Sequence, residues 1–266
     1  MSDYYTDTQG VLRRPGSLIM PQGMVSSFPP TASDPDFPLW SDADIKRVIS
    51  DPNRRDIVKL FPFAQYGTNQ HSTSACNGFA GASAVTRVRK LRGIDDGFVG
   101  SGSFVYSSIN RGQDNGSVLE DGMKAIQEHG VCDQSLNPYD RIFAKQVSPD
   151  ARADALKHKG LSAYRATSRE ALFSGLAAGF VAVTAIMVGP RFDKITNLTA
   201  GVQDGPANHA VLLEDLVWRN GEFQLLMCNS WGQTYGSNGR VYLTWRHLEQ
   251  GWPHHVTYLL PTSSES

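Results

Sequence analysis

The stretch Asn69–Gly81, with the sequence NQHSTSACNGFAG, places the lone cysteine Cys76 directly before a run with helical periodicity. From Phe79 onward, apolar residues recur at the three-and-four spacing of one buried helix face. The run ends at Gly93, after a last turn rich in arginine and lysine. Cys76 is therefore predicted to lie at a helix N-terminus, where unpaired backbone N–H groups and the helix dipole favour a thiolate.

The composition is that of a soluble globular protein. The chain has 266 residues, of which 40% are hydrophobic and 19% are charged, and its net charge is −1. Such a small charge gives no general attraction to nucleic acid or to an anionic membrane. No apolar run reaches the roughly 18 residues of a membrane span, and the N-terminal sequence lacks the apolar core of a secretory signal. We therefore expect neither a nucleic-acid partner nor a membrane partner.

The cysteine content indicates a reducing compartment. Only three cysteines occur, Cys76, Cys132 and Cys228, too few for a disulfide framework. We expect a cytoplasmic location, with association with a virus particle as the alternative. Neither Cys132 nor Cys228 has a histidine or second cysteine at the spacing of metal ligands. We expect no metal and no cofactor.

The N-terminal part of the chain is rich in proline. Residues 1–62 hold eight of the fourteen prolines, which block helix interiors and remove donors from sheet ladders. We predict an extended arm over residues 1–53, interrupted by one short helix that Ser41 caps. Three interpretations remain open for this arm: an irregular surface wrap, a pro-segment that covers a cleft, or an arm that docks the protein onto a larger assembly.

Helical signals dominate the middle of the chain and strand signals its end. Capping residues predict further helices after Ser117, Ser148 and Ser168, the first through a capping box with Glu120. Short runs rich in Val, Leu, Phe and Tyr predict strands, at residues 180–188, 209–218, 223–229, 239–245 and 255–260. This order predicts an α+β protein with a helical lobe at about 70–160 and an antiparallel sheet or barrel lobe at about 161–266.

Three separated blocks of the sequence resemble the papain-like cysteine peptidases. Gln70 precedes Cys76 by six residues, and the segment CNGFA that begins at Cys76 resembles the start of the central helix of that family. The segment NHAV, residues 208–211, is similar to the strand that carries the catalytic histidine of the family. The segment CNSWG, residues 228–232, is similar to the block that supplies its asparagine. The resemblance covers roughly residues 54–245 and is strongest to bacterial and viral members.

The resemblance implies a two-lobe papain-like domain over residues 54–266, with the active site in the cleft between the lobes. It implies a triad in which Cys76 attacks the scissile carbonyl, His209 relays the proton and Asn229 orients the imidazole. His209 and Asn229 follow Cys76 by 133 and 153 residues, close to the roughly 130–150 residues typical of the family. Gln70 and the backbone N–H of Cys76 would hold the oxyanion.

The same resemblance implies candidate substrate-binding residues. Gly116 and Ser117 stand where the family has a glycine-rich segment that pairs with the substrate backbone. Trp231 would shield the bond between Asn229 and His209 from water.

Three positions depart from the family pattern. Asn77 replaces the aromatic residue that usually follows the nucleophile, Tyr235 replaces the second tryptophan of the late block, and Thr73 replaces a cysteine that forms a disulfide. None of these changes removes a catalytic role. They affect the expected substrate pocket instead.

The leading hypothesis is thus a cysteine protease that hydrolyses peptide bonds through an acyl-enzyme, with polypeptides as substrates. One alternative is a structural component of a larger assembly, such as a virus particle, that keeps the papain-like fold and docks through residues 1–53. Another alternative is a cell-wall peptide hydrolase, because a cysteine–histidine pair also serves that chemistry.

Overall fold

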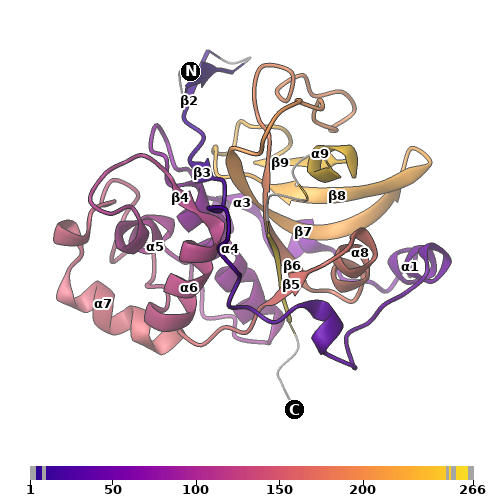
Figure 1. The fold of residues 1–266 in the computed structure, drawn as a ribbon, viewed down its shortest axis with the longest axis horizontal. Coiled ribbons are helices and arrows are strands. Elements are labelled where there is room, and N and C mark those ends of the chain that lie inside the picture. The colour runs from indigo at the N-terminus through magenta and orange to yellow at the C-terminus, as the bar shows by residue number, and fades with distance from the viewer. Residues whose placement is uncertain (1–3, 8–9, 250–251, 253–255, 263–266) are drawn as a thin grey trace.

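The computed structural model describes residues 4–7, 10–249, 252 and 256–262. Helices α4 to α7 lie on one side of the molecule, and an antiparallel sheet accompanied by α1, α8 and α9 forms the other, so the fold is a two-lobe α+β fold (Figure 1). The helices are α1 (Asp42–Ile49), α2 (Ile57–Leu60), α3 (Phe63–Tyr66), α4 (Cys76–Leu91), α5 (Gly102–Ile109), α6 (Leu119–His129), α7 (Pro149–Ala155), α8 (Arg169–Ala177) and α9 (Arg246–Glu249), with 3-10 turns at Thr31–Ser33, Ala144–Gln146 and Leu156–His158. None of the helices in this part of the chain is long and apolar enough to cross a membrane.

The main sheet has six strands in the order β5-β10-β6-β7-β8-β9, and every neighbouring pair is antiparallel. Within the described residues it is an open sheet and not a closed barrel. Its strands are β5 (Tyr164–Ala166), β6 (Val181–Ile186), β7 (His209–Arg219), β8 (Glu222–Cys228), β9 (Arg240–Leu243) and β10 (Thr257–Leu260). The predicted last strand began at residue 255, which lies outside the described residues.

Both faces of the central strands are buried. Val183 of β6 and Leu212 of β7 point into the cluster that contains α4, whereas Ala182 and Leu213 point into the cluster that contains α8. Successive side chains of a strand face opposite sides, so one strand contributes to two cores. Full burial of each such aliphatic side chain stabilises the fold by roughly 1.5–3 kcal/mol. The sheet is therefore a rigid support for residues at its strand ends.

Helix α4 lies between the lobes and is buried over its first thirteen residues, Cys76 to Val88. It packs on β6 and β7 on one side and on α5 and α6 on the other. Gly78 makes the crossing with α5 possible, because a Cβ atom there would lie 2.3 Å from the carbonyl oxygen of Gly102. The helix predicted to begin at Cys76 is thus present, and it is the central helix of the molecule.

A buried ion cluster holds α4 against β7 and β9. Glu214 accepts from Arg87 of α4 at 2.8 Å and from Arg240 of β9 at 2.6 Å. The register of β7 and β8 shifts between Leu213 and Asp215, which places Glu214 at the irregularity. Burial opposes its charge, yet the two guanidinium groups together keep the pKa of Glu214 below its usual value. Removal of one partner would leave a buried charge uncompensated, so the cluster locks α4 to the strand that begins with His209.

The capping box predicted at Ser117 is wrong. Ser117 and Val118 form strand β4, and α6 begins at Leu119 after a Val118 N-cap that provides no side-chain bond. The reason is tertiary, because β4 pairs in parallel with β3 (Ser17–Leu18) of the arm. Glu120 instead accepts from the backbone and hydroxyl of Ser27. Predicted caps at Ser41, Ser148 and Ser168 are present, each accepting a backbone N–H of the first helical turn.

The arm contains more structure than the sequence indicated. Besides β3 and α1, it forms a small antiparallel pair of β1 (Tyr5–Thr6) and β2 (Leu12–Arg13). Figure 1 shows the arm running down between the helical lobe and the sheet before it turns into α1. The arm therefore lies along the junction of the two lobes.

Candidate active site

The three residues of the predicted triad come from three elements that meet at the lobe junction. Cys76 is the first residue of α4, His209 is the first residue of β7, and Asn229 directly follows β8. The backbone N–H of Ala210 donates to the Cys76 sulfur at 3.4 Å. The thiol is therefore in contact with the residue that follows His209. All three side chains are almost fully buried.

His209 and Asn229 form a direct hydrogen bond. Nε2 of His209 lies 2.8 Å from Oδ1 of Asn229, and the same Oδ1 accepts the backbone N–H of Ser230 at 2.9 Å. Because Oδ1 can only accept, Nε2 must carry the proton in the neutral imidazole. Nδ1 then has the free lone pair, and it has no hydrogen-bond partner among the described residues. Trp231 covers the imidazole at a ring-centroid distance of 4.6 Å.

Gln70 is held with its amide nitrogen directed toward the same region. Its Oε1 accepts from the hydroxyl of Ser230 at 2.6 Å, and its Nε2 donates to the carbonyl of Thr73 at 2.7 Å. The second contact of Nε2 is the carbonyl oxygen of Arg14, at 3.4 Å. Gln70 thus presents an N–H donor to the backbone carbonyl of Arg14, in the arm.

A family model described as papain family cysteine protease matches residues 67–256, which is most of the chain. The chain belongs to this family. It is a cysteine-type peptidase with a papain-like fold, and the matched range includes every residue of the predicted triad. A search of curated protein sequences finds no match.

Solved structures of the same fold come from distant organisms. Xylellain, a cysteine protease from Xylella fastidiosa, superposes with a TM-score of 0.64 at 18% identity, and the match covers 93% of this chain and 100% of that chain. The procathepsin B structure from Trypanosoma congolense has a TM-score of 0.63 at 18% identity, covering 94% of this chain and 87% of that one. At these identities the likeness establishes the fold alone.

In this papain-family peptidase the arm crosses the site and is bonded to both lobes. The Gly16 carbonyl accepts the backbone N–H of Ser117 at 2.8 Å, and the Ser17 N–H donates to the carbonyl of Asn208 at 2.9 Å. Gly116 permits this approach, because a Cβ atom there would lie 2.2 Å from the Gly16 oxygen. Gly116 and Ser117, predicted to pair with substrate backbone, are thus paired with the arm.

The arm does not fill the cleft. A cavity of about 540 Å³ remains between its residues 14–18 and the loop of the β lobe at residues 187–190. Asn208, which precedes His209, also lines this cavity. The cleft between the lobes is therefore present beneath and beside the arm.

The β1–β2 end of the arm covers Trp231. The guanidinium carbon of Arg13 lies 4.9 Å from the centre of the Trp231 ring, and Tyr5 meets the same ring edge-on at 6.2 Å. Arg13 is also paired with Asp7 at 2.6 Å, and both side chains are buried. Trp231 was predicted to shield the bond between Asn229 and His209. It does cover His209, and the arm in turn covers Trp231.

Burial opposes the expected activation of the thiol. It raises the pKa of Cys76 to about 11, although the N–H groups of Ala210, Gly16 and Asn77 act in the opposite direction. It also lowers the pKa of His209 to about 4, opposed by the bond to Asn229 and assisted by the charge of Arg13. The arm-covered site thus contains a neutral thiol and a neutral imidazole at pH 7. The thiolate expected from the helix N-terminus is therefore disfavoured in this buried site.

Two acidic residues at the site were missed by the sequence analysis. Asp114 pairs with Arg14 of the arm at 3.1 Å. Asp193 is buried, neither of its carboxylate oxygens has a hydrogen bond of ordinary geometry, and Asp7, Arg13 and Tyr5 of the arm surround it. The only sequence signal for Asp114 is its place directly before Asn115 and Gly116. Asp193 has no such signal.

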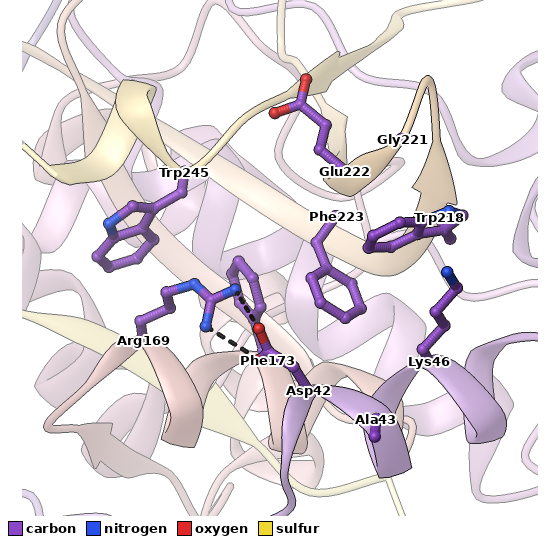
Figure 2. Close-up of a pocket in the computed structure, with 10 residues that line it drawn as sticks. All are labelled: Asp42, Ala43, Lys46, Arg169, Phe173, Trp218, Gly221, Glu222, Phe223 and Trp245. Atoms are coloured by element: carbon purple, nitrogen blue, oxygen red, sulfur yellow. Dashed lines mark hydrogen bonds and ion pairs between the residues drawn. The ribbon is translucent and has the colours of Figure 1, made fainter.

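A second cavity lies away from the triad. It has a volume of about 420 Å³ and lies between α1, α8 and the β7–β8 turn, and Figure 2 shows its aromatic walls. Asp42 and Arg169 form a two-pronged pair at its edge, at 3.0 and 3.1 Å. Lys46 lies over the ring of Trp218 at 3.7 Å. None of the predicted site residues lines this cavity.

Proposed function

We propose that the protein hydrolyses peptide bonds of polypeptides through a Cys76–His209–Asn229 triad and an acyl-enzyme intermediate. The observation that carries this proposal is the 2.8 Å bond between Asn229 and His209, which leaves Nδ1 as a free base at the start of the strand that contacts the Cys76 sulfur. A base held in one tautomer beside a thiol is the arrangement that nucleophilic catalysis needs.

In the proposed reaction, Nδ1 of His209 takes the thiol proton as the sulfur of Cys76 attacks the scissile carbonyl carbon. The negative charge then resides on the carbonyl oxygen, where Nε2 of Gln70 and the backbone N–H of Cys76 donate to it. Collapse breaks the C–N bond, and the imidazolium returns its proton to the leaving amine. Water, deprotonated by His209, attacks the thioester, and release of the acid restores the thiol.

The arm-covered structure is proposed to be a latent form. The N–H of Gly16 is directed to the Cys76 sulfur and helps to lower its pKa, so the arm presents a donor to the nucleophile instead of a carbonyl carbon. The arm therefore occupies the place beside the nucleophile that a substrate would need. One structural neighbour is a procathepsin B, which supports the interpretation of residues 1–53 as an inhibitory pro-segment.

The test uses the full-length chain and a peptidyl epoxide selective for activated thiolates. Arg13→Ala removes the buried partner of Asp7 and the contact with Trp231, so we expect the arm to open. Arg13→Ala should gain one adduct by intact-mass measurement at pH 5.5 and should degrade an unfolded protein. At that pH an ordinary thiol with a pKa near 8.5 is almost fully protonated.

The Arg13→Ala/Cys76→Ala double variant is the matched control, and it should show neither adduct nor degradation. Arg47→Ala, which removes an exposed arginine of α1, should behave like the wild type. Degradation by the double variant would exclude Cys76 as the nucleophile. Absence of both adduct and degradation in Arg13→Ala, with a folded chain, would contradict the proposed function.

A docking role for the arm is a second proposal, and it can coexist with latency. Several arm side chains that face solvent are apolar, including Val11, Leu12, Leu18, Ile19 and Val25. Such a row would suit attachment to a larger assembly, either in the cytoplasm or in a virus particle. Measurement of the size of the chain mixed with its candidate partners would test this. Docking would be contradicted if neither the wild type nor a variant with polar residues at these positions associates with a partner.

A further inference from the structure

Asp114 is a carboxylate held in a fixed orientation at the cleft, and the proposed mechanism leaves it unused. Its Oδ1 accepts the backbone N–H of Ser74 at 2.8 Å and the hydroxyl of Tyr106 at 2.9 Å. Ser74 lies two residues before Cys76, and the Tyr106 hydroxyl also accepts the N–H of Gly116 at 2.9 Å. Oδ1 of Asp114 is thus held by Ser74, in the loop before Cys76, and by Tyr106, which in turn binds Gly116 of the segment that pairs with the arm.

The other oxygen of Asp114 is directed toward the arm. Oδ2 pairs with Nη1 of Arg14 at 3.1 Å, while Nη2 of Arg14 donates to Oδ1 of Asn115 at 3.4 Å. The side chains of Arg14 and Asp114 are 19% and 20% exposed, and Arg14 and Asn115 line the cavity beside the arm. When the arm leaves, Oδ2 of Asp114 loses the Arg14 guanidinium, whereas Oδ1 stays bonded to Ser74 and Tyr106.

Arg14 also places its carbonyl oxygen beside a proposed oxyanion donor. Its carbonyl oxygen is 3.4 Å from Nε2 of Gln70, the proposed oxyanion donor. Arg14 therefore spans the distance from Gln70 to Asp114, with its carbonyl at Gln70 and its guanidinium at Asp114. A substrate residue whose carbonyl is attacked must likewise place its oxygen beside Gln70.

We infer that Asp114 is a specificity-determining residue that selects substrates with arginine, and next lysine, at the residue whose carbonyl Cys76 attacks. This inference rests on the proposed function. The Cα of that residue is bonded to the attacked carbonyl carbon, as the Cα of Arg14 is bonded to its own carbonyl carbon, so its side chain can reach the same carboxylate. Arginine is favoured because its planar guanidinium can engage Asp114 and Asn115 together, whereas the lysine ammonium is a single compact charge.

The experiment compares two fluorogenic peptides that differ only in arginine or its neutral isostere citrulline at the cleaved residue. The full-length chain carries Arg13→Ala, which is expected to open the arm, together with Arg14→Ala, which removes the resident cation. In this background we expect kcat/KM for the arginine peptide to exceed that for the citrulline peptide by about 10- to 100-fold, as a hydrogen-bonded charge pair at a partly buried site would give. Raising the salt concentration should reduce the ratio, because the pair is partly exposed.

Asp114→Asn in the same background is the deciding variant. Its amide oxygen can still accept from Ser74 and Tyr106, so the nucleophile loop keeps its support while the charge is lost. We expect the ratio to fall to within about threefold of unity, since only neutral hydrogen bonds remain. Glu128→Gln, a loss of one charge on the exposed face of α6, should leave the ratio as it was.

The outcomes separate this inference from the proposed function. Cleavage of both peptides at a ratio that Asp114→Asn does not change would overturn the specificity assignment and leave the triad intact. If neither peptide is cleaved and the epoxide does not label Cys76, the proposed function fails and the inference fails with it. Labelling of Cys76 together with a preference for citrulline would overturn the inference alone.

Discussion

The backbone N–H of Ser17 donates to the carbonyl oxygen of Asn208 at 2.9 Å, which ties the arm to the residue directly before His209. On the other side of the arm, Ser117 donates to Gly16 at 2.8 Å. The arm thus bridges the helical lobe and the sheet lobe across the nucleophile. Opening of the site requires the loss of contacts on both sides, and several of these can be weakened separately.

Gly16→Ala should open the arm without any change in charge. A Cβ atom at this position would lie 2.0 Å from the carbonyl oxygen of Ser74, a backbone atom close to Cys76 that cannot move aside cheaply. We expect epoxide labelling of Cys76 in the full-length variant to be at least about tenfold faster than in wild type, because a 1.4 kcal/mol weakening of docking already gives that factor. Val25→Ala, a change at a side chain of the arm that is 78% exposed, is the control for a substitution in the arm. Equal labelling rates for Gly16→Ala and wild type would show that the arm does not limit access.

Acid should weaken arm docking through His209. In the closed site its pKa is about 4 instead of 6.5, so the closed form binds fewer protons there than an open form. This contribution to closure is complete above about pH 6.5 and is lost as the pH falls through about 4. Hydrogen exchange of the Ser17 amide, corrected for its intrinsic pH dependence, should report the opening. A His209→Asn variant should lose this part of the pH dependence, and an unchanged profile would refute the assignment to His209.

The effect of Asp193 on docking of the arm should have the opposite pH dependence to that of His209. Burial and the nearby Asp7 raise its pKa to about 6, so the contribution of this group is complete below about pH 3.8 and is lost as the pH rises through about 6. Asp193→Asn should therefore stabilise the arm-docked fold by about 1–2 kcal/mol at pH 7.5 and leave it nearly unchanged at pH 4, after allowance for solvent screening. Denaturant unfolding at the two pH values measures this. A variant less stable than wild type at pH 7.5 would contradict the prediction.

Asn77 should act as a positioning residue for residues 116–118, the segment that pairs with the arm. It is buried, and its Nδ2 donates to the Ser117 hydroxyl at 3.0 Å and to the Val118 carbonyl at 2.7 Å. Asn77→Ala should reduce the free energy of unfolding by about 1–3 kcal/mol, because both bonds are lost in a buried place. In an opened Gly16→Ala background it should raise KM for peptides that pair with residues 116–118, with a smaller change in kcat.

The control for Asn77 is Ser117→Ala, which removes only one of its two partners and should have a smaller effect on both quantities. The double variant should be less than additive, since the two side chains share one bond. A fall in kcat with unchanged KM would instead place Asn77 in the chemical step.

The sequence alone was sufficient for features that depend on short-range patterns. The helix from Cys76, the strand from His209 and the caps at Ser41, Ser148 and Ser168 are all present, because periodicity and capping act within a few residues. The family could also be predicted from the three motif blocks, and the family model that matches residues 67–256 agrees with it.

Tertiary structure alone decided how the site is occupied and charged. Ser117 has the local sequence of a helix cap, yet pairing with Ser17, one hundred residues away in the chain, makes it a strand. The helix N-terminus favours a thiolate at Cys76, yet burial in the folded chain raises the pKa of the thiol to about 11. The contact of Arg14 with Asp114 likewise joins residues that no local pattern links. Burial and long-range pairing depend on how the whole chain packs, and their free energies exceed the local preferences at these positions.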